Sequence, residues 1–417
     1  MLYRLKDAVA RAWPPAAARR ERRGDRSGLP ALDPGIESSV AAVLGWLCRA
    51  QDLSASRDGG VARHFSLVSG WSTSYPETTG YIVSTFLECS KRFESPDLRD
   101  RARRMIDWLR SIQFEDGGFP GGTVGQVPHV PVVFNTGQVL LGLTSAVRVF
   151  GDDAGPMHRA ADWLVRVQDP DGAWRQYTSP FARGFEKTFD AHIALGLLAA
   201  ARLDPARPWA DAALANIRWG LGRQRGNGWL ADCCLNDPQR PLTHTLAYAL
   251  QGIIEGYLFT RDPGLLEASR RMADGLLGAL RTDGFLPGRL CSDWSAGAGW
   301  ACLTGTAQSA LCWLMLHRET GDERYRDAAF SANRFLRRTM HMDGPPDERG
   351  GVKGSFPVDG DYNPYQYLSW AAKFFLDANL FEEDLREGRA VLPPVEGVRK
   401  PASWNEPSPA MPGGPSS

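Results

Sequence analysis

Carboxyl and imidazole side chains stand at the start of strongly apolar segments, where side chains of these types are costly to bury. Glu77 lies within Tyr-Pro-Glu-Thr-Thr-Gly-Tyr over residues 75–81, Asp190 and His192 open a later segment of this kind, and His244 opens another. A buried polar group without a partner costs roughly 1–3 kcal/mol, and a serine would be cheaper to desolvate at a helix start. We therefore predict acid/base chemistry, with Glu77 and Asp190 as the proton-transferring pair and His192 and His244 assisting.

These polar positions have a structural alternative, which the sequence leaves open. Thr243, Thr304 and Asn363 occupy corresponding places in later segments and are natural N-cap residues, whose side chains accept hydrogen bonds from the first turn of a helix. His244 is also explained as a structural histidine satisfied by its neighbours. Such a ring of polar residues either caps its own helices or binds a ligand.

The elements that position these residues recur along the chain. An Asp-Gly or Asn-Gly pair occurs at intervals of 55 to 60 residues, and a Trp-x4-Gln pattern such as Trp163 and Gln168 precedes each of the first four pairs. The six pairs are Asp58-Gly59, Asp116-Gly117, Asp171-Gly172, Asn227-Gly228, Asp283-Gly284 and Asp343-Gly344. Regular intervals of this length predict a repeated structural unit.

Each unit contains two predicted helices of different character. The first, such as residues 98–113, carries apolar residues at helical spacing and stops at the Asp-Gly turn. The second, such as residues 137–150, is apolar on almost every face and must be buried. Six such pairs predict an all-α fold, an (α/α)6 toroid of six helical hairpins with an inner apolar ring and an outer amphipathic ring.

Long loops join each outer helix to the next inner helix, so all six loops lie on the same rim of the predicted toroid. Loops of about 15–25 residues are uncommon in a compact domain unless they are functional. They must wall a single cavity at the mouth of the ring. The positive ends of the inner helices point into that cavity, which favours an anionic ligand.

One toroidal domain over residues 36–385 is expected, flanked by two tails. Residues 1–35 are basic, with eight Lys/Arg against three Asp/Glu in the first thirty, and residues 386–417 are rich in proline. We predict that both tails are disordered. The alternative for the first tail is a short amphipathic helix that makes weak contact with a membrane surface or a protein. Its apolar face would comprise Leu2, Leu5, Val9 and Trp13.

Composition excludes several functional classes. Lys+Arg and Asp+Glu both number 48, so no overall positive field attracts nucleic acid. No apolar stretch is long enough to cross a membrane. The seven cysteines are odd in number and imply no disulfide framework, which favours the cytoplasm. No His/Cys/Asp cluster has metal-ligand spacing, so we predict neither a metal nor another cofactor.

Two resemblances to known families accompany these patterns. Residues 113–119 and 168–174, each a Gln followed by an Asp-Gly-x-aromatic turn, resemble the QW repeat of the squalene–hopene cyclases, which implies a related toroid. The Asp-x-Asp-Asp acid motif of those cyclases is absent. The second resemblance is to bacterial proteins encoded among exopolysaccharide biosynthesis genes, which carry prenyltransferase/squalene-oxidase-type repeats. It covers nearly the whole toroid and rests on residues 75–81, 133–138, 241–245 and 353–357.

The second resemblance implies a role in bacterial polysaccharide metabolism and names no reaction. Sugars stack on aromatic rings and bond to amides, and cations suit a uronate carboxylate. We therefore expect acid/base chemistry on an acidic, uronate-containing oligosaccharide or polysaccharide, as hydrolase, lyase or epimerase. The residues expected to bind it are Tyr75, Asn135, Gln138, Arg289, Trp294, Trp300, Lys353, Tyr365 and Tyr367.

Three alternatives remain at this point. The loop aromatics are equally explained as plugs that fill the rim. A non-catalytic toroid that binds a glycan or a partner in a biosynthetic complex fits the same residues. The apolar inner ring also allows a terpenoid-cyclase-like protein that binds an isoprenoid, although that chemistry needs an acid deep in the ring.

Overall fold

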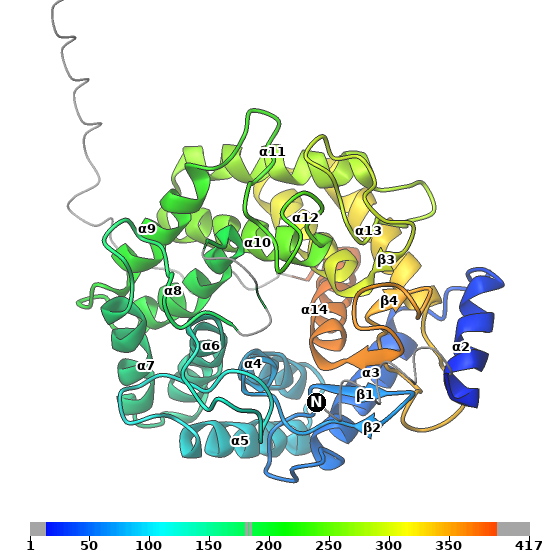
Figure 1. The fold of residues 1–417 in the computed structure, drawn as a ribbon, viewed down its shortest axis with the longest axis horizontal. Coiled ribbons are helices and arrows are strands. Elements are labelled where there is room, and N and C mark those ends of the chain that lie inside the picture. The colour runs from blue at the N-terminus through cyan, green and yellow to red at the C-terminus, as the bar shows by residue number, and fades with distance from the viewer. Residues whose placement is uncertain (1–13, 180–181, 183–185, 390–417) are drawn as a thin grey trace, which may run out of the picture.

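The computed structural model describes residues 14–179, 182 and 186–389. Helices α3 to α14 form two concentric rings (Figure 1). The outer ring comprises α3 (Ile36–Asp52), α5 (Pro96–Ser111), α7 (Gly155–Arg166), α9 (Trp209–Leu221), α11 (Pro263–Ala279) and α13 (Glu323–Arg338). The inner ring comprises α4 (Pro76–Arg92), α6 (Val133–Phe150), α8 (Ile193–Leu203), α10 (Thr243–Thr260), α12 (Leu303–Thr320) and α14 (Ser369–Arg386). A short 3-10 helix, η1 (Thr188–His192), leads into α8.

The inner ring closes on itself. Each inner helix packs against the next, and α14 packs against α4. In α12 every residue from Leu303 to Leu316 is buried, whereas α5 buries only the stripe that faces the inner ring. Burial of apolar surface on this scale is the main favourable term in folding. The predicted all-α (α/α)6 toroid is therefore confirmed.

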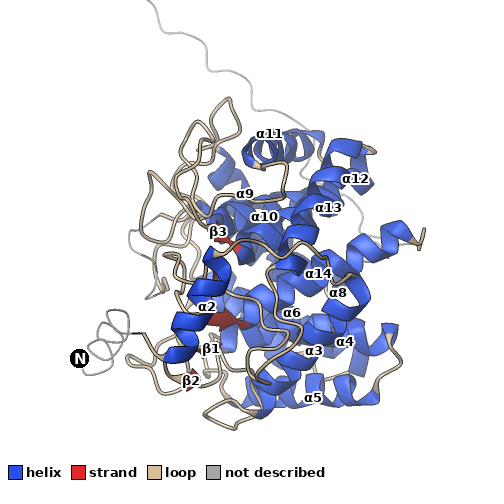
Figure 2. Cartoon of the chain, turned by 90° about the vertical axis from the view of Figure 1, so that its right-hand side faces the viewer, coloured by secondary structure: helices blue, strands red, loops and turns tan. Residues whose placement is uncertain are grey.

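The long loops lie together at one rim (Figure 2). There β1 (His64–Ser66) pairs antiparallel with both β2 (Gly70–Trp71) and β5 (Gln366–Leu368), so that Phe65 lies opposite both Trp71 and Tyr367. A second small sheet pairs β3 (Ala301–Cys302) with β4 (Ser355–Phe356). The first sheet joins the loops of the first and last units and so closes the rim where the chain ends meet.

The repeated glutamine and Asp-Gly pair hold neighbouring outer helices together. The Nε2 amide of Gln168 donates to the carbonyl of Gly172 in its own turn, at 2.9 Å, and to the carbonyl of Ala212 in α9, at 2.9 Å. Asp171 tightens the same turn by accepting a hydrogen bond from the backbone N–H of Ala173. Gln51, Gln113 and Gln224 make the same paired contacts in their units. The repeat is therefore a structural device and not part of a site.

The glycine of each turn allows the next outer helix to approach closely. Gly117 has φ +103°, and a Cβ added there would lie 2.2 Å from the carbonyl oxygen of Arg159 in α7. The assignment of Gly344 to the sixth turn is wrong, because a Cβ there would meet nothing within 4 Å. Gly350, with φ +79°, occupies that place instead: its Cβ would lie 2.1 Å from the carbonyl of Ala42 in α3. The sixth turn thus closes the outer ring.

The first tail differs in part from expectation. Residues 16–26 form a helix, α2 (Ala16–Arg26), although residues 1–35 were expected to be disordered. Its buried Glu21 and Asp25 pair with Lys353, a long-range contact that local composition does not reveal. The predicted amphipathic segment of Leu2 to Trp13, and residues 390–417 of the other tail, lie outside the described residues. None of the described helices is both long and apolar enough to cross a membrane.

Candidate active site

A cavity of about 280 Å³ opens on the loop-bearing rim, at the N-terminal ends of inner helices. Four of the residues that line it were predicted: Tyr75, Glu77, His244 and Arg289. Among the described residues, the rest of the lining is Arg63, Phe134, Ser179, Phe189, Leu235, Asn236, Leu242, Thr245, Tyr248, Asp361, Tyr362, Asn363 and Trp370. The described lining is thus largely polar and aromatic, and it includes the guanidinium groups of Arg63 and Arg289.

Glu77 is a carboxyl group poised to exchange a proton near neutral pH. It lies in the first turn of α4, where Pro76 occupies the first helical position, and its Oε2 accepts a hydrogen bond from the Tyr75 hydroxyl. Burial raises the pKa of Glu77 from 4.5 to about 7, and the Tyr75 hydrogen bond and the Arg63 charge offset only part of that rise. Both protonation states are therefore available at neutral pH, as general acid/base catalysis requires.

His244 comes from the opposite side of the ring. It lies on α10, which is three places from α4 in either direction around the inner ring (Figure 1). Its Nδ1 lies 3.1 Å from Oε1 of Gln308, and because an amide oxygen only accepts, Nδ1 carries the proton. Burial lowers the pKa of His244 to about 3, so the ring is neutral and Nε2 keeps a lone pair. His244 therefore offers an acceptor opposite Glu77.

A chain of glutamines joins His244 to His192 beneath the cavity. The Nε2 amide of Gln308 donates to Oε1 of Gln251 at 3.1 Å, and the same oxygen lies 3.2 Å from Nε2 of His192. The other ring nitrogen of His192 faces Gln138 at 2.9 Å. Burial lowers the pKa of His192 well below its usual value, so this ring is neutral. Its one proton can be donated to only one of the two facing amide oxygens, Oε1 of Gln138 or Oε1 of Gln251. Gln138 therefore orients His192 and does not line the cavity.

Tyr248 lies next to both histidines, between this row of polar side chains and the cavity. Its ring centroid lies 4.2 Å from that of His192 and 4.1 Å from that of His244. It stands four residues after His244 on α10, and residues at this spacing share a helix face. The histidine and glutamines next to it, His192, Gln251 and Gln308, are buried and do not line the cavity.

Two arginines place positive charge in the cavity. The guanidinium of Arg63 lies 4.7 Å from the ring centroid of Trp370, and its NH2 group donates to Oδ1 of Asn363 at 3.3 Å. Arg289 donates to the Arg240 carbonyl at 2.8 Å and lies 3.4 Å from Asp361. Planar guanidinium groups recognise carboxylates through paired hydrogen bonds. The site is therefore suited to an anionic ligand.

The structure does not bring Asp190 to the cavity with Glu77. Asp190 lies in η1 and is 3% exposed, and it is outside the cavity lining. Burial raises its pKa to about 7, opposed only by the charge of Lys187. The Lys187 ammonium is itself buried without a hydrogen-bond partner among the described residues. The predicted pair of carboxyl groups across the mouth is thus not formed.

Two of the predicted aromatic contacts fill gaps left by glycines. Trp294 packs against α11, where a Cβ on Gly275 would lie 2.0 Å from the indole, and its Nε1 donates to the Asn227 carbonyl. Trp300 packs on Gly288, where a Cβ would lie 2.2 Å away. Neither lines the cavity. These two tryptophans therefore fill space at the rim, as the alternative to ligand binding predicted.

Four other predicted ligand contacts also lie away from the cavity. The Asn135 amide donates to the Pro120 carbonyl at 3.1 Å, and Lys353 is buried in ion pairs with α2. Tyr365 is 5% exposed and its carbonyl accepts a hydrogen bond from the Leu67 amide. Tyr367 is fully buried in β5. The partners of Lys353 and Tyr365 come from distant parts of the sequence, which spacing alone does not reveal.

The inner helices begin without the predicted side-chain caps. Thr304 Oγ1 is buried and has no hydrogen-bond partner among the described residues. Thr243 directs its hydroxyl to the Gly288 carbonyl, at 3.4 Å, and Asn363 lies in the loop before β5 and contacts Arg63. The capping alternative therefore does not explain these three residues.

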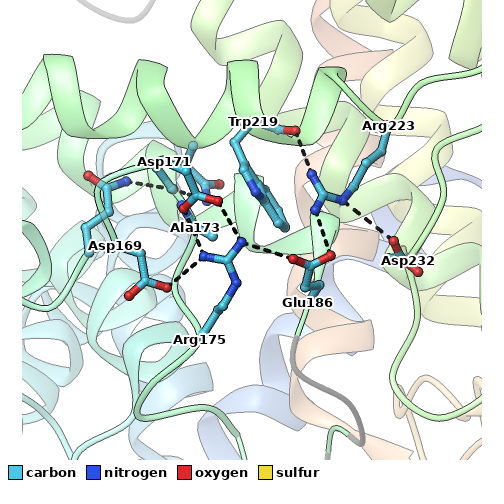
Figure 3. A network of polar contacts seen from close by, with 11 residues as sticks. Asp169, Asp171, Ala173, Arg175, Glu186, Trp219, Arg223 and Asp232 are labelled. Atoms are coloured by element: carbon cyan, nitrogen blue, oxygen red, sulfur yellow. Dashed lines mark hydrogen bonds and ion pairs between the residues drawn. The ribbon is translucent and has the colours of Figure 1, made fainter.

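The loop that precedes η1 is held at both ends by ion pairs outside the cavity (Figure 3). Arg175 binds Asp169, Asp171 and Glu186, and Glu186 also binds Arg223 of the following unit. Each exposed pair contributes little alone, but the connected network ties the two ends of the loop together. Ser179 of the same loop lines the cavity.

Among the lining residues that were not predicted, Arg63, Tyr248, Tyr362 and Trp370 contribute charged or aromatic side chains to the site. Tyr248 had a usable signal, because it follows His244 by one helical turn. Arg63 and Tyr362 lie in loops whose course depends on contacts between the first and last units, and no local motif marks them. Trp370 follows the first residue of α14, where an aromatic residue is also expected in a core.

The raised pKa of Glu77 predicts a specific dependence of stability on pH. The folded state holds this proton more tightly than the unfolded state, so the contribution is full below about pH 4.5 and is lost as the pH rises to about 7. The Glu77→Gln variant lacks this group. The free energy of unfolding is measured in urea at pH 4.5 and pH 8 for both proteins. From the lower to the higher pH, the variant should become more stable relative to the wild type by roughly 3 kcal/mol. An equal pH dependence in both proteins would contradict the raised pKa.

Known proteins share parts of this sequence pattern and the fold that carries the site. The profile of the squalene-hopene cyclase C-terminal domain matches residues 71–253. The structure of an unsaturated glucuronyl hydrolase specific for heparin is similar with a TM-score of 0.68 at 16% identity, covering 84% of this chain and 98% of that one. No curated protein matches the sequence.

Two further solved structures are similar to the chain over their whole length. D-mannose isomerase gives a TM-score of 0.68 at 13% identity, covering 86% of this chain and 100% of that one. Cellobiose 2-epimerase from Spirochaeta thermophila gives 0.66 at 16% identity, covering 89% and 100%. The chain therefore has the same helical toroid fold as these proteins.

Proposed function

We propose that the chain is a carbohydrate-active enzyme that transfers protons on an acidic, uronate-containing saccharide in bacterial polysaccharide metabolism. The observation that carries this proposal is Glu77, a carboxyl group with a pKa of about 7 in a cavity that also holds Arg63 and Arg289. The names of the similar structures, a glucuronyl hydrolase, an isomerase and an epimerase, support sugar chemistry on this fold.

Glu77 acts as the acid/base group in this proposal, and the arginines hold the substrate carboxylate. A cation on a uronate carboxylate makes the adjacent C–H more acidic, because it stabilises the negative charge that builds up when the proton leaves. His244 accepts a hydrogen bond from a sugar hydroxyl through Nε2. The substrate's negative charge also raises the pKa of His244 from its value of about 3, since a nearby anion favours the imidazolium.

Among the three reactions considered, the geometry favours proton transfer at carbon, by epimerisation or elimination. Hydrolysis of glycosides usually requires two carboxyl groups flanking the bond. Within the described lining the second carboxylate is Asp361, which is 72% exposed and paired with Arg289. The free thiols of all seven cysteines support a reducing compartment, which we take to be the cytoplasm.

The anionic preference is tested by binding D-glucuronate and D-glucose, which differ only in the carboxylate. We expect isothermal titration calorimetry to show tighter binding of glucuronate, and Arg289→Gln to weaken it by about 10- to 100-fold, because a charged hydrogen bond contributes roughly 1.5–3 kcal/mol. Arg207→Gln, on the outer surface, is the matched control. Equal affinity for both sugars would contradict the proposal, and binding of a prenyl diphosphate alone would favour the isoprenoid alternative.

A further inference from the structure

Helix α2, which lies outside the two rings (Figure 1), contacts the loop of residues 353–363, whose far end lines the cavity. The Lys353 ammonium lies 2.7 Å from Oε1 of Glu21 and 2.5 Å from Oδ1 of Asp25, and all three side chains are buried. The other oxygen of Asp25 accepts a hydrogen bond from the Val358 amide at 2.7 Å. Residues 353–363, here called the wall loop, are therefore anchored on α2 at their near end.

A buried lysine between two carboxylates holds the segments that carry these groups in one relative position. An ammonium group taken out of water needs close counter-charges, and removal of one partner leaves the others buried and uncompensated. His341 and Glu348 lie beside Glu21 and form a group that could hold a metal ion. The Lys353 ammonium already supplies the cation that the carboxylates of α2 require. The cluster is therefore best explained as a clamp.

The far end of the wall loop reaches both cavity arginines. Asp361 pairs with Arg289 at 3.4 Å, and Oδ1 of Asn363 accepts a hydrogen bond from Arg63 at 3.3 Å. Between them, the Tyr362 hydroxyl accepts a hydrogen bond from the indole of Trp370 at 2.9 Å. The two groups that would recognise a carboxylate are thus connected to one loop.

The two ends of the wall loop are joined directly. Ser355 Oγ donates to the Tyr362 carbonyl at 2.9 Å and accepts from the Tyr362 amide at 3.2 Å. A Cβ on Gly360 would lie 2.6 Å from the side chain of Ser355, so the loop is closely packed on itself. A shift of the end that α2 holds is therefore passed on to Asp361, Tyr362 and Asn363.

We infer that α2 is a clamp that positions the two cavity arginines through the wall loop, with Glu21, Asp25 and Lys353 as positioning residues for recognition of an acidic sugar. The identity of the ligand rests on the proposed function, whereas the mechanical coupling does not. The clamp affects how well the site distinguishes acidic from neutral sugars. This is because Asp361 and Asn363 contact the two arginines, and neither contacts Glu77.

The test compares Lys353→Met and the milder Asp25→Asn with the wild-type full chain. Asp25→Asn keeps an oxygen that can accept from Val358 while removing the charge that binds Lys353. Arg23→Ala is the matched control, since Arg23 is exposed on the same helix. Hydrogen–deuterium exchange of peptides covering residues 353–363 and the dissociation constants of D-glucuronate and D-glucose are measured for each protein.

Both clamp variants should exchange faster in the wall loop and bind glucuronate about tenfold more weakly, with glucose affinity unchanged. Arg23→Ala should match the wild type. Unchanged exchange in both variants, or faster exchange with unchanged glucuronate affinity, would overturn the inference. If wild type binds neither sugar, the proposed function fails. In that case, faster exchange confined to the wall loop of the clamp variants would still support the clamp. Unchanged exchange would overturn it.

Discussion

Replacement of Glu77 with glutamine should reduce turnover of an acidic saccharide by roughly 100- to 10,000-fold, the usual contribution of a positioned general acid or base. Glutamine has nearly the same shape and can still accept the Tyr75 hydrogen bond, but it cannot exchange a proton. Because burial already penalises the charged form of Glu77, the variant should be no less stable than the wild type at pH 7. Steady-state rates and thermal unfolding measure the two effects separately.

Asp190→Asn is the matched control for that substitution. Asp190 also stands at the start of an inner segment, and burial raises its pKa to about 7 as well, but it does not line the cavity. We expect Asp190→Asn to lose less than about tenfold in turnover, since it removes no group that touches the substrate. Equal losses in both variants would restore the paired-carboxyl hypothesis, and full activity of Glu77→Gln would refute the proposed role of Glu77.

Gly117→Ala should destabilise the toroid by about 3 kcal/mol or more, because it combines an unfavourable backbone conformation with a steric clash. A left-handed backbone costs a non-glycine residue roughly 1–2 kcal/mol, and overpacking adds roughly 1–3 kcal/mol. Both apply at Gly117, where φ is +103° and the new Cβ would lie 2.2 Å from the Arg159 carbonyl. The change is measured as the difference in free energy of unfolding in urea.

Gly344→Ala separates the two contributions. Gly344 has φ +102°, almost the same as Gly117, yet no atom lies within 4 Å of its added Cβ. We expect a loss of only about 1–2 kcal/mol there, from the backbone alone. Equal losses at the two sites would show that the turn does not hold α7, and that the repeat has some role other than joining the outer helices.

The sequence predicts the fold well because the signals of the toroid are local. The glutamine and the Asp-Gly turn recur within each unit, and the apolar inner helices are recognisable one at a time. The exception is the sixth turn, where the glycine in the structural position, Gly350, stands six positions after Gly344. The contact that identifies the true position, Gly350 against Ala42 of α3, joins the two ends of the toroid and leaves no local pattern.

The sequence predicts only those site residues whose position is set by the start of an inner helix. Tyr75, Glu77 and His244 line the cavity because inner helices converge there with their N-termini, which the repeat already implies. Lys353 could not be placed in this way, since its partner Glu21 is 332 residues away and its charge is satisfied before any ligand binds. Arg63 was missed for the same reason, because a sheet between the first and last units sets its place.

The central claim, that Glu77 moves a proton on an acidic sugar, is tested most directly by proton NMR in D2O. Wild type and Glu77→Gln are each incubated with glucuronate- and galacturonate-containing oligosaccharides and with their neutral counterparts. We predict that the wild type exchanges a ring C–H for deuterium or forms an unsaturated uronide from at least one acidic substrate, and that Glu77→Gln does neither. Release of a new reducing end with neither deuterium exchange nor an unsaturated uronide would indicate hydrolysis instead. Unchanged spectra for every uronate, or equal conversion by both proteins, would contradict the claim.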